Sequence, residues 1–349
     1  MRLNFFSTDL GIDLGTSNVL ISVENAGVVV REPSVVAVDK NTGRILQVGS
    51  AARNMLGRTP GNVVAMQPLR DGVISDHDMT VKMLQELFRK AIKSSLFNPK
   101  PRVVISVPSG VTQIEERNVI NAAIEAGARR VYLIEEPLAA ALGAGLDISG
   151  PKGHMVVDIG GGTTDVAVLT MNGIAASTST KIAGIAFDEA IARYVRRQYG
   201  VVIGQNTAED IKIQIGCVYP PQTDAGIIVK GRDAKTSLPR QINLTASEIY
   251  TEALRRPAKQ LADEVVSVLE DTSAELVGDI AENGITITGG ASQIAGMEQL
   301  LSERTGIPCR VADDPACCVA YGCGKSLGWI NTMNEGPINI AKKRIMRQG

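Results

Sequence analysis

The feature that most constrains how this chain folds is a glycine-rich turn that is followed by a strand. Residues 156–169 read VVDIGGGTTDVAVL, and the part after the glycines is short and β-prone, with no helical period. Phosphate loops of the dinucleotide and P-loop kinds run from a strand into a helix instead. We therefore predict a hairpin whose glycines let backbone N–H groups close on a phosphate, while Asp158 holds the metal that accompanies it.

The chain contains this strand-aspartate-glycine turn-strand motif twice. Residues 10–21 read LGIDLGTSNVLI, and Asp13 takes the place of Asp158. One glycine turn alone would indicate a simple hairpin. Two in matching positions, each after an apolar strand and an aspartate, predict two related domains that grip one nucleoside triphosphate between them.

Two other nucleotide motifs fail on spacing. Asp165 occupies the position where the Rossmann pattern needs its third glycine. Val319 stands where a P-loop that ends in Gly324-Lys325-Ser326 needs its first glycine.

Composition fits a layered α/β protein of two domains. The 349 residues are 44% hydrophobic but only 3% aromatic, so Val, Ile, Leu and Ala must fill the core. The net charge of −1 gives no support for nucleic-acid binding. Five cysteines without paired CxxC spacing indicate reduced thiols and no zinc site. With no secretory signal and no apolar run of transmembrane length, we expect a cytoplasmic protein that is free to lie on a membrane surface.

Periodicity and turn residues predict strands and helices along both halves of the chain. Strands are expected at 9–14, 18–23, 28–31, 34–38, 102–107, 131–134, 226–230, 240–244, 284–288 and 308–311, with a hairpin over 155–171. Helices are expected at 79–93, 112–126, 136–144, 187–199, 246–256, 258–270, 293–304 and 316–330. A turn at 147–152 predicts domain I over 1–147, completed by helix 316–330, then domain II over 148–315 and a basic tail over 331–349.

These segments resemble the actin/Hsp70/sugar-kinase superfamily and, within it, the MreB family of bacterial actin-like cell-shape proteins, along nearly the whole chain. The hairpins identify only the superfamily, whereas Gly57-Arg58-Thr59-Pro60 and Ile134-Glu135-Glu136-Pro137 together are specific to the MreB family. Further matching segments are Glu32 to Val36, Asp71 to Ile74, Phe187 to Ala190 and Thr288 to Gly290. The resemblance implies an actin-like ATPase fold of two RNase H-like domains, each with a small subdomain, around a nucleotide cleft.

ATP and Mg²⁺ are the ligands that the resemblance implies. Asp13 and Asp158 would flank Mg²⁺ and its waters, which suits a hard cation. The residues expected to bind the nucleotide are Thr16, Ser17, Asn18, Gly160, Gly161, Gly162, Glu209, Asp210, Ile211, Lys212, Gly289, Gly290, Ala291 and Ser292. A surface ion pair between Glu209 and Lys212, three residues apart on a helix, is the simpler interpretation of those two.

Glu136 is expected to orient the attacking water, and Asp158 and Thr163 complete the predicted catalytic set. Glu135 is the alternative, because only one of two adjacent carboxylates can face the cleft. Stabilisation of a helix N-terminus would also explain Glu136. An ordinary hydrogen bond within the hairpin would explain Thr163.

The chain departs from the family pattern at the cleft. Ala291 and Ser292 stand in a loop that usually reads Gly-Gly-Gly-Ala, Ile185 replaces an aspartate, and Arg53 stands where a lysine is common. Loss of the aspartate removes a charge beside the nucleotide. We therefore expect slow ATP hydrolysis in a divergent family member.

Two surfaces are implied by the resemblance. Leu96 and Phe97 lie near three lysines at a helix end and would insert into an anionic membrane leaflet, with packing on their own helix as the alternative. Ile114 and Arg117 lie on a helix that matches the family's face for antiparallel filament pairing. A solvated helix charge is the alternative for Arg117.

The expected function is that of an ATP-dependent, membrane-associated filament protein that organises cell-wall synthesis and maintains rod shape. Its partners would be further copies of itself, the inner face of the cell membrane and the cell-wall elongation machinery. A small-molecule kinase of the superfamily would need a second substrate pocket, for which we find no insert. A Hsp70-like ATPase would need a substrate domain after the final helix, where only about 20 residues remain.

Overall fold

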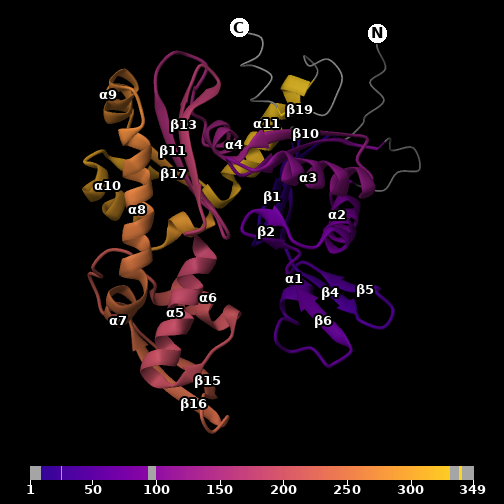
Figure 1. Cartoon of the computed structure of the whole chain (residues 1–349), viewed down its shortest axis with the longest axis vertical. Helices are drawn as coiled ribbons and strands as arrows, with labels where there is room; N and C mark the ends of the chain where they lie inside the picture. The colour runs from indigo at the N-terminus through magenta and orange to yellow at the C-terminus, as the bar shows by residue number, and fades with distance from the viewer. Residues whose placement is uncertain (1–8, 25, 93–99, 331–337, 340–349) are drawn as a thin grey trace.

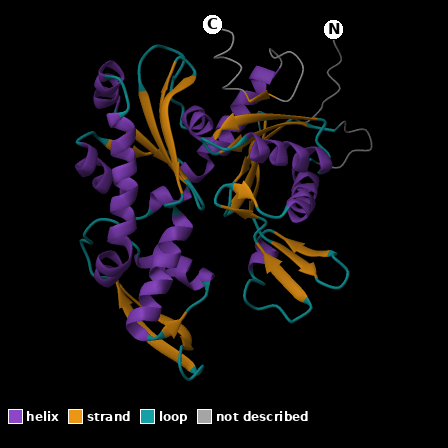
Figure 2. Ribbon diagram, viewed as in Figure 1, coloured by secondary structure: helices purple, strands orange, loops and turns teal. Residues whose placement is uncertain are grey.

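Two large sheets lie side by side in the computed structural model, which describes residues 9–24, 26–92, 100–330 and 338–339 (Figures 1 and 2). The first sheet has the strand order β19-β10-β9-β1-β2-β3, and the second has the order β13-β12-β11-β17-β18. We call the first sheet with β4–β8, α1–α4 and α11 the first half. The second sheet with β14–β16 and α5–α10 is the second half.

The first half is built mainly from the N-terminal part of the chain. Its large sheet contains β1 (Leu10–Leu14), β2 (Asn18–Val23), β3 (Gly27–Pro33), β9 (Arg102–Val107), β10 (Arg130–Glu135) and β19 (Ile338–Asn339). Its small strands are β4 (Val36–Asp39), β5 (Ile45–Val48), β6 (Val63–Met66), β7 (Leu69–Arg70) and β8 (Val73–Ile74). Its helices are α1 (Ser50–Arg53), α2 (His77–Ala91), α3 (Gln113–Glu125), α4 (Glu136–Gly143) and α11 (Cys318–Ile330).

The second half runs without interruption from β11 to β18. Its large sheet contains β11 (His154–Ile159), β12 (Thr164–Thr170), β13 (Gly173–Thr180), β17 (Ile285–Thr288) and β18 (Cys309–Val311). Its small sheet contains β14 (Val201–Val202), β15 (Gly226–Asp233) and β16 (Pro239–Thr245). Its helices are α5 (Gly184–Tyr199), α6 (Gln205–Ile215), α7 (Ala246–Glu248), α8 (Arg255–Glu270), α9 (Ala274–Asn283) and α10 (Met297–Thr305).

The two sheets share one plan, as the repeated glycine hairpin predicted. In the first sheet, antiparallel β3-β2-β1 continues into parallel β9 and β10. In the second sheet, antiparallel β13-β12-β11 continues into parallel β17 and β18. Both predicted hairpins are confirmed, and each places its turn at the same point of its sheet.

Helices α4 and α11 lie between the two sheets and form a common core with both. One buried cluster joins Val104 and Ile134 of the first sheet to Val156 of the second, with Leu138 on α4 and Val319 on α11. The helices cross through glycines: a Cβ on Gly143 would overlap the Cys318 carbonyl, and one on Gly322 would overlap the Ala139 carbonyl. The crossing therefore joins α4 closely to α11 within the first half, and the buried cluster packs both helices against the second sheet.

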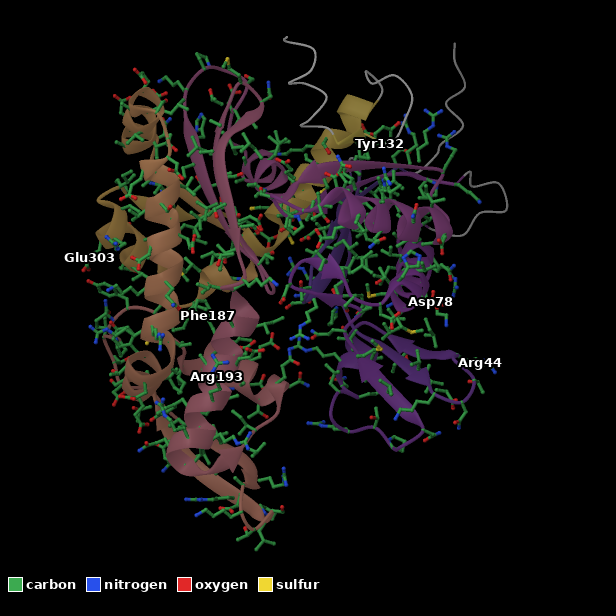
Figure 3. The ribbon with its side chains drawn as sticks, viewed as in Figure 1. Arg44, Asp78, Tyr132, Phe187, Arg193 and Glu303 are labelled. Atoms are coloured by element: carbon green, nitrogen blue, oxygen red, sulfur yellow. The ribbon has the colours of Figure 1, made fainter. Side chains whose placement is uncertain are left out.

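The outer face of each sheet has its own core. Residues of α2 and α3 cover the first sheet, and residues of α5 and α8 cover the second. Phe187 on α5 is fully buried in the second core, whereas Arg44 and Asp78 lie at the outer surface (Figure 3). Helix α3 begins with a capping box, in which the Glu115 N–H donates to Thr112 Oγ1 at 3.3 Å and the Thr112 N–H donates to the Glu115 carboxylate at 2.7 Å.

Several predicted elements differ from the structure for local reasons. The helices expected at 246–256 and 258–270 form one continuous helical segment that contains a π turn at Ile249–Leu254. The π turn lies just before Pro257, whose missing N–H leaves the Ala253 carbonyl without its helical donor. The helix expected at 293–304 begins only at Met297, after a 3₁₀ turn at Gly290–Gln293, because Gly296 has a φ of 87°.

Other elements were absent from the sequence prediction. Helix α9, the third strand β13 and the small strands β5 and β6 were not predicted. Within the tail expected over 331–349, Ile338–Asn339 form β19, which pairs with β10. Residues 340–349 lie outside the described part of the chain.

Candidate functional site

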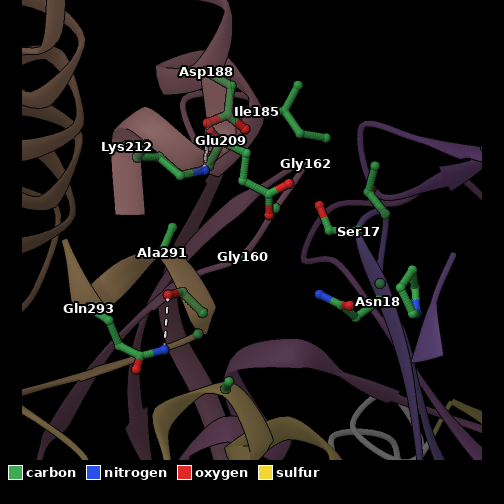
Figure 4. Close-up of a pocket in the computed structure, with 18 of the residues that line it drawn as sticks. Ser17, Asn18, Gly160, Gly162, Ile185, Asp188, Glu209, Lys212, Ala291 and Gln293 are labelled. Atoms are coloured by element: carbon green, nitrogen blue, oxygen red, sulfur yellow. Dashed lines mark hydrogen bonds and ion pairs between the residues drawn. The ribbon is translucent and has the colours of Figure 1, made fainter. Parts of the chain in front are cut away.

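A cavity of about 690 Å³ opens where the two glycine hairpins face each other (Figure 4). Its lining comes from both halves. The predicted residues that line it are Asp13, Thr16, Ser17, Asn18, Glu136, Asp158, Gly160, Gly161, Gly162, Thr163, Glu209, Lys212, Gly289, Gly290 and Ala291. Glu136 is among the lining residues and Glu135 is not, which favours Glu136 of the two adjacent acids.

The first hairpin packs so closely against the second that two positions of the second turn have room only for glycine. A Cβ on Gly161 would overlap the Ser17 side chain, and one on Gly162 would overlap the Thr16 hydroxyl. The Gly160 N–H donates to the Thr163 carbonyl at 2.9 Å and closes the turn. The two turns thus present hydroxyl groups and bare backbone to one narrow space, as phosphate binding requires.

Three predicted nucleotide-binding residues do not line this cavity. Ile211 is buried in the core of the second half. Ser292 is buried beneath the loop and donates its hydroxyl to the Gly289 carbonyl at 2.6 Å. Asp210 lines a second cavity of about 350 Å³, together with Arg53 and Arg58.

Three carboxyl groups gather at the hairpin end of the cavity. Burial and the neighbouring Asp158 carboxylate raise the pKa of Asp13 to about 8. Burial raises the pKa of Asp158 to about 6, against a hydrogen bond of 2.6 Å that the Thr288 hydroxyl donates to Asp158 Oδ1. Burial, followed by the Asp165 carboxylate, raises the pKa of Glu136 well above its usual value.

This donor set fits a divalent cation. Asp13 and Asp158 lie close enough to repel each other when both are ionised, and a cation between them would relieve that repulsion. Carboxylate oxygens are the ligands that Mg²⁺ prefers, and Mg²⁺ keeps several waters while it binds phosphate. The two aspartates therefore suit a Mg²⁺ ion held partly through water.

The other end of the cavity holds paired charges. Lys212 Nζ lies 2.8 Å from Asp188 Oδ1 and donates to the Gly184 carbonyl at 3.0 Å. Glu209 pairs with Arg53 of α1, so a bridge spans the two halves. The simpler interpretation, a surface pair between Glu209 and Lys212, is wrong, because each has a different partner.

Several lining residues were missed as site residues in the sequence prediction. Asp188 lies in a segment that carried the family resemblance, one helical turn after Gly184, and that spacing could have indicated it. Arg31 and Gln293 line the cavity without any motif to indicate them. Gln293 Nε2 donates to the Gly290 carbonyl at 3.2 Å (Figure 4).

The departure at Ile185 lies within the cavity. Its N–H donates to the Gly161 carbonyl at 2.8 Å, and its side chain lies beside the second hairpin (Figure 4). An apolar group therefore adjoins the turn that is expected to hold the phosphates.

Of the two predicted surfaces, the filament-pairing surface on α3 lies within the described residues and the membrane segment does not. Leu96 and Phe97 lie outside the described residues. On α3, Ile114 is 71% exposed and Arg117 is exposed as well. Within the described part of the chain, no helix is both long and apolar enough to cross a membrane.

Comparison with known proteins gives one consistent result. A family model described as MreB/Mbl protein matches residues 7–335. The chain is 48% identical over 322 residues to the cell shape-determining protein Mbl of Bacillus subtilis strain 168, covering 92% of this chain and 96% of that protein. It is 49% identical over 330 residues to the cell shape-determining protein MreB of Escherichia coli K12, covering 93% and 95%. The crystal structure of MreB 5 of Spiroplasma citri bound to AMPPNP matches with a TM-score of 0.86 and 37% identity, over 93% of this chain and 96% of that one.

The duplicated sheets and the cavity between them define an actin-like fold, as the resemblance implied. Within that class, the chain belongs to the MreB/Mbl family of cell shape-determining proteins.

Proposed function

We propose that this protein binds ATP with Mg²⁺ in the cleft, hydrolyses it slowly and forms actin-like filaments that maintain rod shape. The observation that carries the proposal is the cavity itself, because both glycine hairpins and three carboxyl groups line one end of it. The relative from Spiroplasma citri, bound to AMPPNP, supports an adenine nucleotide as the ligand. The domain boundaries at 147/148 and 315/316 are part of this proposal.

In the proposed mechanism, each side of the cleft has its own task. Thr16, Ser17 and Asn18 hold the phosphates from the first half, and the backbone of Gly160 to Gly162 holds them from the second. Mg²⁺, held by Asp13 and Asp158 through water, would neutralise phosphate charge. Glu136 orients the attacking water, and the Thr163 hydroxyl helps to position it.

Glu136→Gln tests the hydrolytic part of the proposal. The amide keeps the size of the side chain, so ATP binding should stay within about twofold, whereas phosphate release should slow by ~10²-fold or more. The readouts are phosphate release and ATP affinity, measured on the same protein preparation. Glu135→Gln is the matched control and should leave both unchanged. If the two variants exchanged these results, the assignment would pass to Glu135.

Membrane attachment is the second part of the proposal, and it depends on Leu96 and Phe97. Their double substitution by serine should abolish co-sedimentation with anionic liposomes while assembly in solution continues. Burial of two such side chains contributes roughly 3–5 kcal/mol at most, so firm attachment would need several subunits of one filament. Unchanged sedimentation of the double variant would overturn the membrane role of this segment.

The cellular role follows from assembly at the membrane. We propose that antiparallel filament pairs, joined through Ile114 and Arg117 of α3, lie on the inner face of the cell membrane and guide the cell-wall elongation machinery. Exposure of both side chains on one helix supports this pairing.

A further inference from the structure

Asp165 is a fully buried acid with no assigned role, and it lies at the junction of the two halves. It belongs to β12 and stands opposite Asp158 in the antiparallel register with β11. Its Oδ1 atom accepts a hydrogen bond of 2.7 Å from the backbone N–H of Ser109, which follows β9 in the first half. A side chain of the second half is therefore fixed to the backbone of the first.

The same hydrogen bond brings Asp165 next to Glu136. Strands β9 and β10 are parallel neighbours, and Glu135 pairs with Val107 in their register. Glu136, the residue after Glu135, therefore lies beside the chain that leaves β9 at Val107 and continues to Ser109. The pKa of Glu136, which burial raises, is raised further by the Asp165 carboxylate, so the two carboxyl groups are close.

The second oxygen of Asp165 has polar neighbours but no well-aligned hydrogen bond. Within the described part of the protein, Asp165 Oδ2 is buried and has no partner in good hydrogen-bond geometry, although the side chains of Thr163, Ser179 and Glu136 lie near this carboxyl. A buried polar atom without a partner is destabilising, so natural structures rarely keep one without a reason. The Glu136 carboxyl beside it can supply that partner if the two groups share one proton.

We propose that Asp165 is a positioning residue for Glu136. A proton shared between Asp165 Oδ2 and one oxygen of the Glu136 carboxyl joins the two groups and leaves the other Glu136 oxygen to face the attacking water, while the Ser109 N–H holds Asp165 in place. Because Asp165 and Glu136 belong to different halves, the water-orienting group is aligned only when the halves are closed. This inference rests on the proposed ATP hydrolysis.

A double-mutant cycle tests the inference. We would measure phosphate release and ATP affinity for the wild type, Asp165→Ala, Glu136→Gln and the double variant. Asp165→Ala should slow turnover at saturating ATP roughly tenfold or more, as a misplaced catalytic group does, with ATP affinity within about twofold. In the Glu136→Gln background the same change should cost no further turnover, because a positioning residue acts through the group that it positions.

Two further variants separate positioning from folding. Asp165→Asn keeps an acceptor for the Ser109 N–H and can donate to Glu136, so it should recover most of the turnover that Asp165→Ala loses. Thr164→Val, on the same strand, removes a hydroxyl that donates to the Ile182 carbonyl at 2.7 Å. It should lower the melting temperature without slowing turnover.

The outcomes that overturn the inference are distinct from those that overturn the proposed function. Equal losses from Asp165→Ala in both backgrounds would mean a structural role alone, as would Asp165→Asn behaving like Asp165→Ala. If Asp165→Ala does not fold, Asp165→Ser, which keeps a small polar side chain, gives the same cycle. No turnover by the wild type would overturn the proposed hydrolysis, and the positioning role with it.

Discussion

At the scale of residues, the cleft separates paired charges from unpaired ones. All three basic residues of its lining have acidic partners: Arg31 with Asp314, Arg53 with Glu209 and Lys212 with Asp188. The carboxyl groups left over are those of Asp13, Glu136 and Asp158, at the hairpin end. A nucleoside triphosphate would add further negative charge there, so its binding should depend strongly on a divalent cation.

Asp158→Asn should make ATP affinity depend less on Mg²⁺. The amide keeps an oxygen for the hydrogen bond from Thr288 but loses the charge. Without Mg²⁺, the variant should bind ATP more tightly than the wild type, because one repulsion is gone. With Mg²⁺, it should bind ATP more weakly, because one side of the ion's site is gone. Titration with a fluorescent ATP analogue, with Mg²⁺ and with EDTA, measures both.

A control and a contrary result are simple to define for this variant. Asp147→Asn makes the same change at an exposed acid outside the cleft lining and should alter neither affinity. If Asp158→Asn shifted both affinities in the same direction, Asp158 would act through the fold and not through the cation.

The residues of the hairpin end could be predicted from the sequence, because each lies in a contiguous segment: Asp13 and Asp158 in the glycine motifs, and Glu136 in Ile134-Glu135-Glu136-Pro137. The residues of the other end are less predictable. Arg53 and Glu209 meet from opposite halves, and only the closed fold brings them together. Ile211 and Ser292 lie in matching segments, yet helix phase and a hydrogen bond turn them into the interior.

At the scale of elements, α4 and α11 come into close backbone contact where they cross in the common core. A glycine of each helix lies against a backbone carbonyl of the other: Gly143 of α4 against Cys318, and Gly322 of α11 against Ala139. Neither glycine therefore has room for a methyl group. Substitutions that enlarge such a contact force the backbones apart and typically cost 1–3 kcal/mol.

Gly322→Ala should lower the free energy of unfolding by about 2 kcal/mol or more, because its Cβ would overlap the Ala139 carbonyl. Gly328 lies on the same helix, is exposed and has open space around it. Gly328→Ala should therefore stabilise the protein by roughly 0.5–1 kcal/mol, through helix propensity alone. Denaturant unfolding of the two variants tests the pair. A loss of stability no larger for Gly322→Ala than for Gly328→Ala would show that the crossing can relax.

Helices with a clear apolar period were predicted well, since α2, α3 and α5 lie within a few residues of their expected bounds. The small strands β5 and β6 were missed, because each has only four residues and neither alternates between apolar and polar residues. Helix bounds were also misjudged at two positions. Pro257 lacks the N–H that the preceding turn needs, and Gly296 has a positive φ just before the first residue of α10.

At the scale of the whole molecule, the outer surface of α3 offers a patch suited to self-association. An antiparallel filament pair has two-fold symmetry, so each residue on the axis meets the same patch of the other copy. A charge introduced there acts twice in every contact.

Arg117→Asp should therefore leave single protofilaments that still bind ATP. The new carboxylate would lie near its own symmetry mate and near Glu116 of both copies, and like charges repel across such a contact. Electron microscopy of filaments assembled with ATP shows their width directly. Arg129→Asp gives the same charge change at an exposed residue beyond α3 and should leave pairs intact. Paired filaments of normal width from Arg117→Asp would reduce Arg117 to a solvated helix charge.

The position of α11 also has a consequence for synthesis on the ribosome. The second half is continuous in sequence from β11 to β18, so all of its strands have emerged before α11 does. The first half begins earlier, but its inner face stays open until α11 packs on α4 and β1. Domains fold as units once their chain is available. The half that is translated later can therefore finish folding first, and the cleft takes its final form only when α11 closes the half that was begun before it.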